Sequence, residues 1–183
     1  MIIGYKVPTL KTAEDSREAY ALNILSGILD GGRSSRLSKN LVREQEVAAS
    51  AGAGYNLYSA RESLFLFDGT PNAENTLEEL EMAITQEIEK LQNELVSERE
   101  LKRVKAQVVA GEVYQQDSVQ RQAYVIGSLE TVGLGWQTMN EYADNIQKIT
   151  AEDVRDVAKK YLTDDFKTVA ILTPLARASD GEK

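Results

Sequence analysis

The chain has 183 residues with no histidine and no cysteine, and its 29 acidic and 21 basic side chains give a formal net charge of −8. The lack of cysteine excludes disulfides, thiolate nucleophiles and cysteine-bound zinc, and the lack of histidine excludes Ser-His-Asp triads and histidine-bound metals. The acidic balance leaves no basic surface for phosphates, so we expect no nucleic-acid partner.

Length and composition predict a single globular domain. A hydrophobic content of 42% with 27% charged residues is typical of such a domain. No apolar run approaches the roughly 18 residues that a membrane span requires, and the first six residues lack the features of a signal peptide. Because Met1 leads directly into a strand-like segment, we expect the chain to be cut from a longer protein. The absence of cysteine fits a cytosolic or a periplasmic location.

The first half of the chain predicts the order strand, helix, short helix, strand, strand. The first strand is β-branched and aromatic and stops at Pro8. Thr12 and Asp15 have the spacing of a capping box that opens the next helix, and glycines 31 and 32 end it. Alternation with period two, followed by an apolar run, predicts an antiparallel hairpin. The expected ranges are 2–7, about 13–29, a short helix through Leu37, Leu41 and Val42, 47–57 and 63–69.

The second half predicts consecutive helices and a last strand. Leucine and isoleucine at 3/4 spacing make the first of these helices the clearest in the sequence. Capping boxes open two of the others, at Ser97/Glu100 and Thr150/Asp153. The expected helices are 74–95, 98–114, 118–131, 136–147 and 151–161, and the expected strand is 168–172. We therefore predict one α+β domain over 1–175, an antiparallel sheet backed by helices, with a polar tail over 176–183.

Carboxylates are the obvious acid–base candidates in a chain without histidine. Seven glutamates lie on predicted helices, opposite or beside the apolar stripes, which is typical of solvated helix faces. They are Glu78, Glu79, Glu81, Glu87, Glu89, Glu98 and Glu100. No Asp-rich loop has the spacing of an EF-hand, so we expect no metal in this chain.

Four other segments can be interpreted either as functional or as purely structural. Residues 31–36, Gly-Gly-Arg-Ser-Ser-Arg, could bind an anion, but they lack the GxxxxGK[ST] and GxGxxG patterns, which favours a helix corner. Gly52 and Gly54 within a strand indicate close packing or a bulge. Arg121 and Tyr124 lie one helical turn apart, either as donors to a peptide backbone or as part of a polar helix face. Trp136 follows a glycine, which favours a packing anchor at a helix start.

Several segments, taken in order, resemble the C-terminal domain of the M16 (insulinase/pitrilysin-like) peptidase family. They are the strand Gly4–Pro8 with the helix end Ile28–Gly32, the signature Ser34-Ser35-Arg36-Leu37, the segment Leu41–Ala48, the helix start Ser97–Lys105, the segment Ile149–Val154 and the closing Thr173-Pro174. The resemblance covers about 2–175, nearly the whole chain.

This resemblance implies an antiparallel α+β domain of the LuxS/MPP-like metallohydrolase type. In the family, two such domains enclose a chamber, and the N-terminal one binds zinc through an HxxEH motif and a downstream glutamate. A chain without histidine resembles the second, inactive domain, so zinc is expected only in the partner half. The implied partners are the zinc-bearing N-terminal domain and a peptide substrate, with self-association of the chain where that half is missing.

The resemblance also bears on individual residues. Many family members contribute from this domain an arginine and a tyrosine, seven residues apart, which bind the substrate carbonyl. The similar segment over 41–48 places Val42 and Ala49 at these positions, so the donor pair is absent here. Arg43 is the nearest substitute, but a neighbour on a helix points elsewhere. Arg43, Arg121 and Tyr124 stay as surface candidates, and the domain is left with a shape and docking role.

Two hypotheses of different classes follow. In the first, the chain is the C-terminal domain of a bacterial zinc metallopeptidase, inactive alone, with part of its surface apolar and uncovered. In the second, it is a non-catalytic structural subunit of a processing or respiratory assembly. An HxxEH motif encoded upstream of Ile2 favours the first, and a degenerate version favours the second. A third hypothesis, an unrelated acidic interaction domain, requires the ordered matches to be coincidental.

Overall fold

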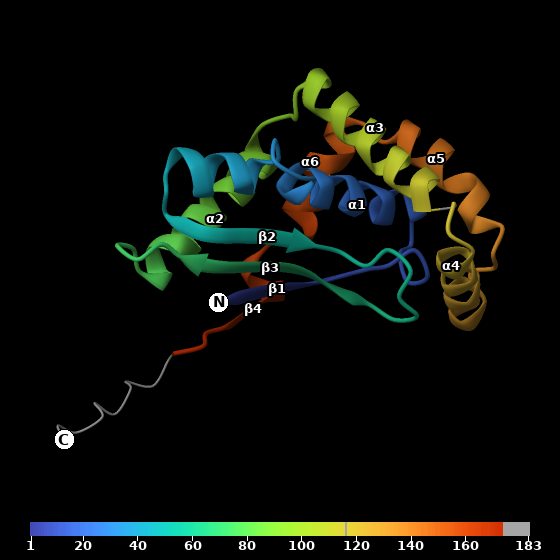
Figure 1. Ribbon diagram of the computed structural model, residues 1–183, viewed down its shortest axis with the longest axis horizontal. Coiled ribbons are helices and arrows are strands. Elements are labelled where there is room, and N and C mark those ends of the chain that lie inside the picture. The colour runs from blue at the N-terminus through green and yellow to red at the C-terminus, as the bar shows by residue number, and fades with distance from the viewer. Residues whose placement is uncertain (116, 174–183) are drawn as a thin grey trace.

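The computed structural model of the protein describes residues 1–115 and 117–173 (Figure 1). The strands are β1 (Ile2–Val7), β2 (Ala48–Gly54), β3 (Ser63–Pro71) and β4 (Lys167–Ala170). The α-helices are α1 (Ser16–Asp30), α2 (Leu77–Asn93), α3 (Glu98–Gln115), α4 (Val119–Val132), α5 (Thr138–Lys148) and α6 (Ala151–Tyr161). A π-helix, η1 (Leu37–Glu44), and a 3-10 turn, η2 (Asp164–Phe166), complete the elements. The predicted α+β class is confirmed.

The four strands form one sheet in the order β2-β3-β1-β4, and every neighbouring pair is antiparallel. The hairpin predicted for the first half is β2 and β3. The last strand pairs with the first, because β1 lies between β3 and β4 and Tyr5 faces both Phe65 and Lys167. The ends of the described chain are therefore joined through the sheet.

The hydrophobic core lies between one face of the sheet and the helices. Ile3, Tyr5 and Val7 of β1 point into this core together with Phe65 and Phe67 of β3. α1 is the central helix. It packs against the sheet as well as α3, α5 and α6, so it is apolar around most of its surface. Its buried residues are Ala19, Tyr20, Ala21, Leu22, Ile24, Leu25, Ile28 and Leu29.

The capping boxes predicted from sequence differ in outcome. At α6 both halves of the Thr150/Asp153 box form. At α3, Ser97 accepts the Glu100 N–H. The Thr12/Asp15 box is wrong: α1 begins at Ser16, and Asp15 caps it by accepting the N–H of Arg17. Thr12 instead accepts the N–H of Thr9 and stabilises the preceding turn.

Three predicted ranges were too long. The strand expected over 47–57 is β2, because the chain leaves the sheet after Gly54 and the phenol of Tyr55 donates to the carbonyl of Pro8. The helix expected over 74–95 begins later, because Thr76 forms a capping box there. The strand expected over 168–172 ends at Ala170, which faces Ile2. The tail expected over 176–183 lies outside the described residues.

Two side-chain predictions were also wrong. Glu87 does not lie on a solvated face: it is 1% exposed, and its Oε1 accepts from Lys90 at 2.6 Å. Trp136 is not a packing anchor, because 47% of its surface is exposed, and its backbone N–H donates to the Glu130 carboxylate. Gly52 behaves as predicted, since an added Cβ would lie 2.8 Å from Asp68. Among the described residues, no helix combines the length and the apolar character needed to cross a bilayer.

Candidate functional site

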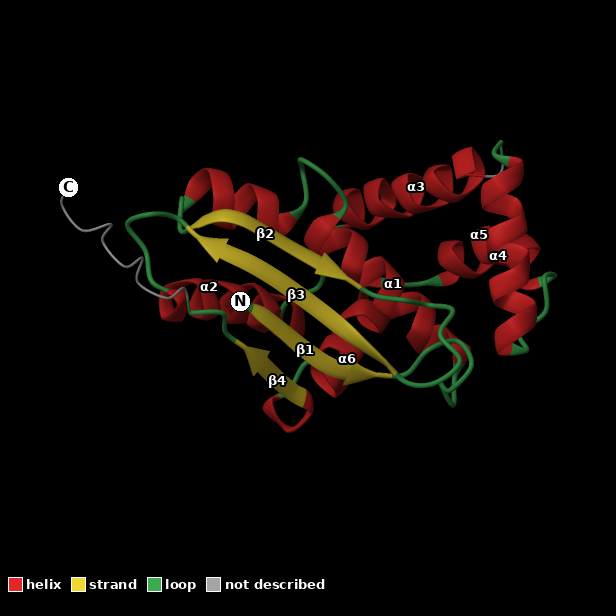
Figure 2. Ribbon diagram, turned by 60° about the horizontal axis from the view of Figure 1, so that its bottom comes forward, coloured by secondary structure: helices red, strands yellow, loops and turns green. Residues whose placement is uncertain are grey.

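The side of the sheet that faces away from the core carries apolar side chains. Ile2, Leu64 and Leu66 are 50%, 48% and 41% exposed. Both leucines close over Gly4, where an added Cβ would lie 3.4 Å from Leu66 and 3.5 Å from Leu64. Figure 2 looks onto this side, and no helix lies in front of the strands. We call Ile2, Gly4, Leu64 and Leu66 the bare face; such positions are ordinarily polar where one side of a sheet is wet.

A groove of about 790 Å³ adjoins the bare face. Its large apolar side chains are Leu64 and Phe166, which are 48% and 42% exposed. Its charged ones are Arg61 and an ion pair in which Lys6 Nζ lies 2.6 Å from Glu62 Oε2. Because Lys6 and Glu62 neutralise each other, Arg61 leaves the groove with a local positive charge. The groove can therefore hold an apolar side chain next to a carboxylate.

The two positions implied by the resemblance lie on adjoining elements. Val42 is on η1 and packs partly buried against the core, and Ala49 is exposed on β2. Neither side chain can donate a hydrogen bond. Arg43 is exposed, but its Nη2 donates to the carbonyl of Arg33 at 2.6 Å and its Nε to that of Ser38 at 3.3 Å. Arg43 therefore holds the corner between α1 and η1.

Arg121 and Tyr124 lie together on α4. The Arg121 guanidinium lies 5.6 Å from the centre of the Tyr124 ring, and the tyrosine is 67% exposed. In Figure 1, α4 lies at one end of the molecule and the start of β2 at the other. The structure thus brings Arg121 to Tyr124 but brings neither to the part of β2 that carries Ala49.

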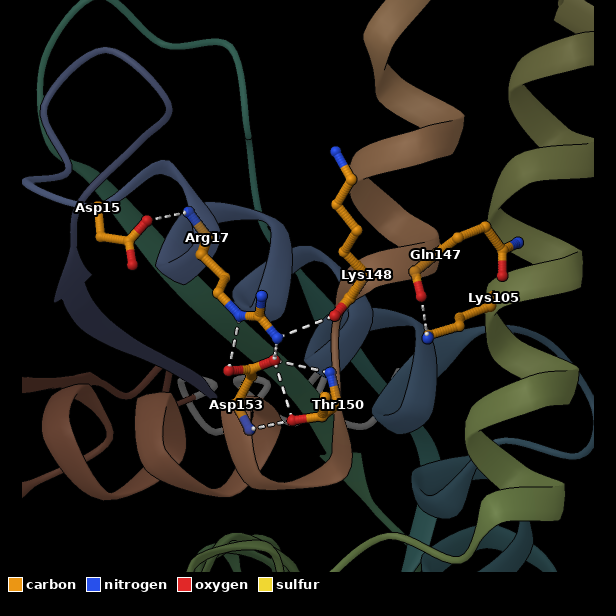
Figure 3. A network of polar contacts seen from close by, with 7 residues as sticks. All are labelled: Asp15, Arg17, Lys105, Gln147, Lys148, Thr150 and Asp153. Atoms are coloured by element: carbon orange, nitrogen blue, oxygen red, sulfur yellow. Dashed lines mark hydrogen bonds and ion pairs between the residues drawn. The ribbon is translucent and has the colours of Figure 1, made fainter.

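A polar network joins α1 to the loop between α5 and α6 (Figure 3). Arg17 donates to both carboxylate oxygens of Asp153, at 2.9 and 2.6 Å, and to the carbonyl of Lys148 at 2.9 Å. Partial burial acts to raise the pKa of Asp153, but hydrogen bonds from Arg17 and Thr150 outweigh it and hold the pKa below its usual value. Since Asp153 is fully engaged, the network fastens α1 to α6 and offers no free base.

Lys105 lies beside this network, and its pKa is also shifted. Burial lowers the pKa of Lys105, and its Nζ donates to the carbonyl of Gln147 at 2.7 Å. This bond joins α3 to α5, so the amine is held in a structural contact. In the described part of the chain, no three or more Asp or Glu side chains gather as a metal ligand set. The described Asp and Glu side chains therefore do not form a site that fits a zinc ion.

Sequence reasoning predicted an uncovered apolar surface but did not assign it to residues, and it missed the groove. The signal was nonetheless present in the run Leu64-Phe65-Leu66-Phe67, which is apolar at every position. A half-buried strand alternates apolar with polar residues, so an unbroken run indicates that both faces meet apolar surroundings. Here the phenylalanines enter the core and the leucines lie on the bare face.

Fold and site define a class: a layered α+β domain with an antiparallel sheet, one uncovered apolar face and, in its described part, no metal ligand set. Comparison with known sequences gives the family, because residues 1–108 match the peptidase M16 inactive domain. The chain belongs to the M16 peptidase family as its inactive domain.

Individual relatives agree with this membership. The zinc protease PqqE of Helicobacter pylori is 28% identical over 172 residues, which are 94% of this chain and 37% of that protein. A solved protease from Helicobacter pylori superposes with a TM-score of 0.81 at 27% identity, covering 91% of this chain and 38% of that one. An inactive peptidase domain from Bordetella parapertussis reaches 0.83 at 18% identity, covering 97% and 93%. The chain spans 37% of the length of the curated relatives it matches.

Proposed function

We propose that this chain is the non-catalytic domain of a zinc metallopeptidase and completes a peptide-binding chamber against a zinc-bearing half. The bare face carries the proposal: its three exposed apolar side chains lie on a sheet side that no described helix covers. Exposed apolar patches of this kind mark surfaces that meet a partner or a ligand. In this proposal zinc is bound by the partner half. The curated relatives of this chain are named zinc proteases.

The groove gives the chamber wall a substrate preference. Leu64 and Phe166 offer an apolar wall and Arg61 a guanidinium at its rim. A peptide that passes along this wall is held best when an apolar side chain is followed by an acidic one or by a terminal carboxylate. Because the donor pair is absent at Val42 and Ala49, the domain acts on substrate by holding it and not by polarising the reacting carbonyl.

Hydrolysis and zinc content test this proposal. The isolated chain is expected to bind no stoichiometric zinc and to cleave no peptide, and the assembly with its zinc-bearing half is expected to do both. Leu64→Asp should lower kcat/KM of the assembly by about tenfold or more, because a charge replaces an apolar contact. Met82→Asp is the matched control, since Met82 is 61% exposed on α2, away from the bare face. Stoichiometric zinc with hydrolysis by the isolated chain would contradict the proposal.

The same assembly separates the peptidase from a structural subunit. A scaffold also docks through an apolar face, so binding alone does not distinguish the two. Peptide cleavage by the assembled form supports the peptidase, whereas tight assembly without zinc and without cleavage supports the scaffold. Arg61→Ala adds a substrate-level readout, because it should raise KM for peptides with an acidic residue and leave assembly unchanged.

A further inference from the structure

The turn between α1 and η1 is held in one conformation by a glycine and a buried serine. Gly32 has a φ of 111°, which L side chains rarely adopt. Ser35 is fully buried, and both its backbone N–H and its hydroxyl donate to the carbonyl of Gly32, at 2.9 and 2.6 Å. These contacts fix the turn and leave Arg33 and Ser34 exposed at its tip.

Two arginines from other elements bind the backbone of this tip. Arg43 of η1 donates from Nη2 to the carbonyl of Arg33 at 2.6 Å. Arg103 of α3 donates from Nη2 to the carbonyl of the next residue, Ser34, at 3.4 Å. Because consecutive residues lie about 3.8 Å apart, the two guanidiniums are separated by a distance on the order of 10 Å. We call Arg33, Arg43 and Arg103 the arginine corner.

The arginine corner carries positive charge that no described carboxylate neutralises. Arg36 lies next to it but forms a bidentate ion pair with Glu100, at 2.9 and 3.2 Å. Arg33 is exposed, and its guanidinium makes no hydrogen bond or ion pair with a described residue. Arg43 and Arg103 each place two of their five N–H donors on neutral oxygens. The three guanidiniums therefore form a local basic site on a chain of formal net charge −8.

Three like charges around a fixed turn favour binding of an anion. Their mutual repulsion is relieved when a negative group lies between them. Arg43 and Arg103 are already held by backbone carbonyls, so binding orders few side chains and its entropic cost is small. The rest of the acidic chain repels an anion only weakly at this point, because the Debye length is about 8 Å at physiological ionic strength.

The spacing of the corner favours carboxylates spread along a peptide. A guanidinium forms bidentate hydrogen bonds with a carboxylate. Alternate residues of an extended chain point to the same side and lie roughly 7 Å apart, so two acidic side chains can each meet a different arginine. A single phosphate is smaller than the separation of Arg43 and Arg103 and would leave one of them unpaired. A nucleic acid would extend past the corner over an acidic molecule, which the net charge of −8 disfavours.

We propose that the arginine corner is a docking site for an acidic segment of a partner protein, with carboxylates on alternate residues. α1 and α3 lie in the helical layer, on the side of the sheet away from the bare face (Figure 2). A partner bound at the corner therefore leaves the bare face free, and the inference does not depend on the proposed function. The segment over 31–36 then binds an anion through guanidiniums of its own and of neighbouring elements, and not through a phosphate-binding loop.

Fluorescence anisotropy with a labelled peptide of alternating glutamate and serine tests the proposal. The peptide is expected to bind the chain saturably at physiological salt, and a peptide with glutamine in place of glutamate is expected not to bind. Arg33→Gln should weaken binding about tenfold. Arg33→Lys should weaken it about threefold, because the charge stays and the planar fork is lost. Both variants should unfold at the same urea concentration as the parent, since the Arg33 side chain is exposed.

Lys159→Gln is the matched control for the change in net charge. Lys159 is exposed on α6, so its loss should change binding of the peptide by less than about twofold. Equal effects of Arg33→Gln and Lys159→Gln would overturn the inference, because the charge of the whole chain and not the corner would then attract the peptide. Absence of saturable binding would overturn it too. So would displacement of the peptide by an equal concentration of inorganic phosphate, or tighter binding of a single-stranded RNA of the same charge.

Discussion

Glu87 is a charged residue inside the apolar stripe of a helix. Leu80, Ile84 and Leu91 are fully buried on α2, and Glu87 lies three residues after Ile84 and four before Leu91. The helical period therefore places it in the core, and the pattern of the sequence was sufficient to predict this. Lys90 stabilises the carboxylate at Oε1, while Oε2 has no hydrogen-bond partner among the described residues. Burial of Glu87 Oε2 without a hydrogen bond therefore lowers the free energy of unfolding.

Removing the two members of this pair should have unequal effects. Lys90→Met leaves a buried carboxylate without its cation and should lower the free energy of unfolding by about 1–2 kcal/mol, since Lys90 is half-exposed and partly screened. Glu87→Leu removes the charge and should be neutral or stabilising. Urea unfolding measures both. A larger loss for Glu87→Leu than for Lys90→Met would show that the ion pair is a net stabilising contact.

Glu46 has the left-handed backbone conformation, with φ at 53°, at the turn between η1 and β2. Its Cβ makes this conformation costly. Glu46→Gly should therefore raise the free energy of unfolding by about 1 kcal/mol, measured by urea unfolding. Gln45→Gly is the matched control, because the φ of Gln45 is −88° and glycine there relieves nothing. Equal changes for the two variants would argue that the turn is not strained.

At the scale of elements, the Arg17–Asp153 contact fastens α1 to α6. The pKa of Asp153 is lowered in the folded protein. A lowered carboxyl pKa stabilises the fold above the pKa of the unfolded chain, near 3.9, and this contribution is lost as the pH falls through the folded value. Asp153→Asn should therefore cost about 1 kcal/mol at pH 7 and progressively less below pH 4. Unfolding of both proteins as a function of pH measures the difference.

The control for this pH effect is a carboxylate that is itself largely exposed. Asp156 pairs with Arg155, and its side chain is 62% exposed. Asp156→Asn should change the free energy of unfolding by a few tenths of a kcal/mol or less at every pH. A cost for Asp153→Asn that does not shrink on acidification would assign its effect to packing and not to charge.

α4 is held to the domain by few side chains. Only Val125 and Leu129 are buried on it, whereas Val119 and Tyr124 are 82% and 67% exposed. Elements with so little buried apolar surface open without global unfolding. Amides of α4 should therefore exchange on the order of a hundredfold faster than those of α1. Leu129→Ala should speed α4 further and leave α1 unchanged; equal exchange in both helices would contradict this.

The sequence predicted the kinds of elements better than their limits, and for a physical reason. Helical periodicity and the Thr150/Asp153 box are local, so α2 and α6 were found from residues close in sequence. The pairing of β4 depends on β1, more than 160 residues away along the chain, and no local pattern reports which strand lies beside it. Likewise the spacing of Arg121 and Tyr124 placed them together on one helix, but the position of α4 depends on packing.

In the candidate site, too, some features could be predicted from local sequence and others depend on packing between distant segments. The apolar run Leu64–Phe67 indicated a strand with two apolar faces, which was available from sequence. Which face stays uncovered depends on where the helices pack, and that is a property of the whole molecule. The groove combines residues from β1, the loop before β3 and η2, and these segments meet only through the sheet.

At the scale of the whole molecule, an uncovered apolar face on a chain of charge −8 sets two effects against each other. Net charge favours a monomer, and the apolar patch favours association. Because Leu64 and Leu66 are both exposed on the bare face, we expect the isolated chain to dimerise reversibly through this face. Sedimentation velocity at rising concentration should show the mass moving toward that of a dimer.

Leu66→Lys tests which surface is responsible for this dimer. Leu66 is 41% exposed, so lysine should be tolerated there with a small loss of stability, while two copies of the new charge would be brought together at a symmetric interface. The variant should stay monomeric at concentrations where the parent associates. Met82→Lys adds the same charge at an apolar position on α2 that is 61% exposed, and it should associate like the parent. If both lysine variants are monomeric, the bare face is not specifically responsible, because a smaller net negative charge would by itself favour association. If neither is monomeric, the chain associates through another surface.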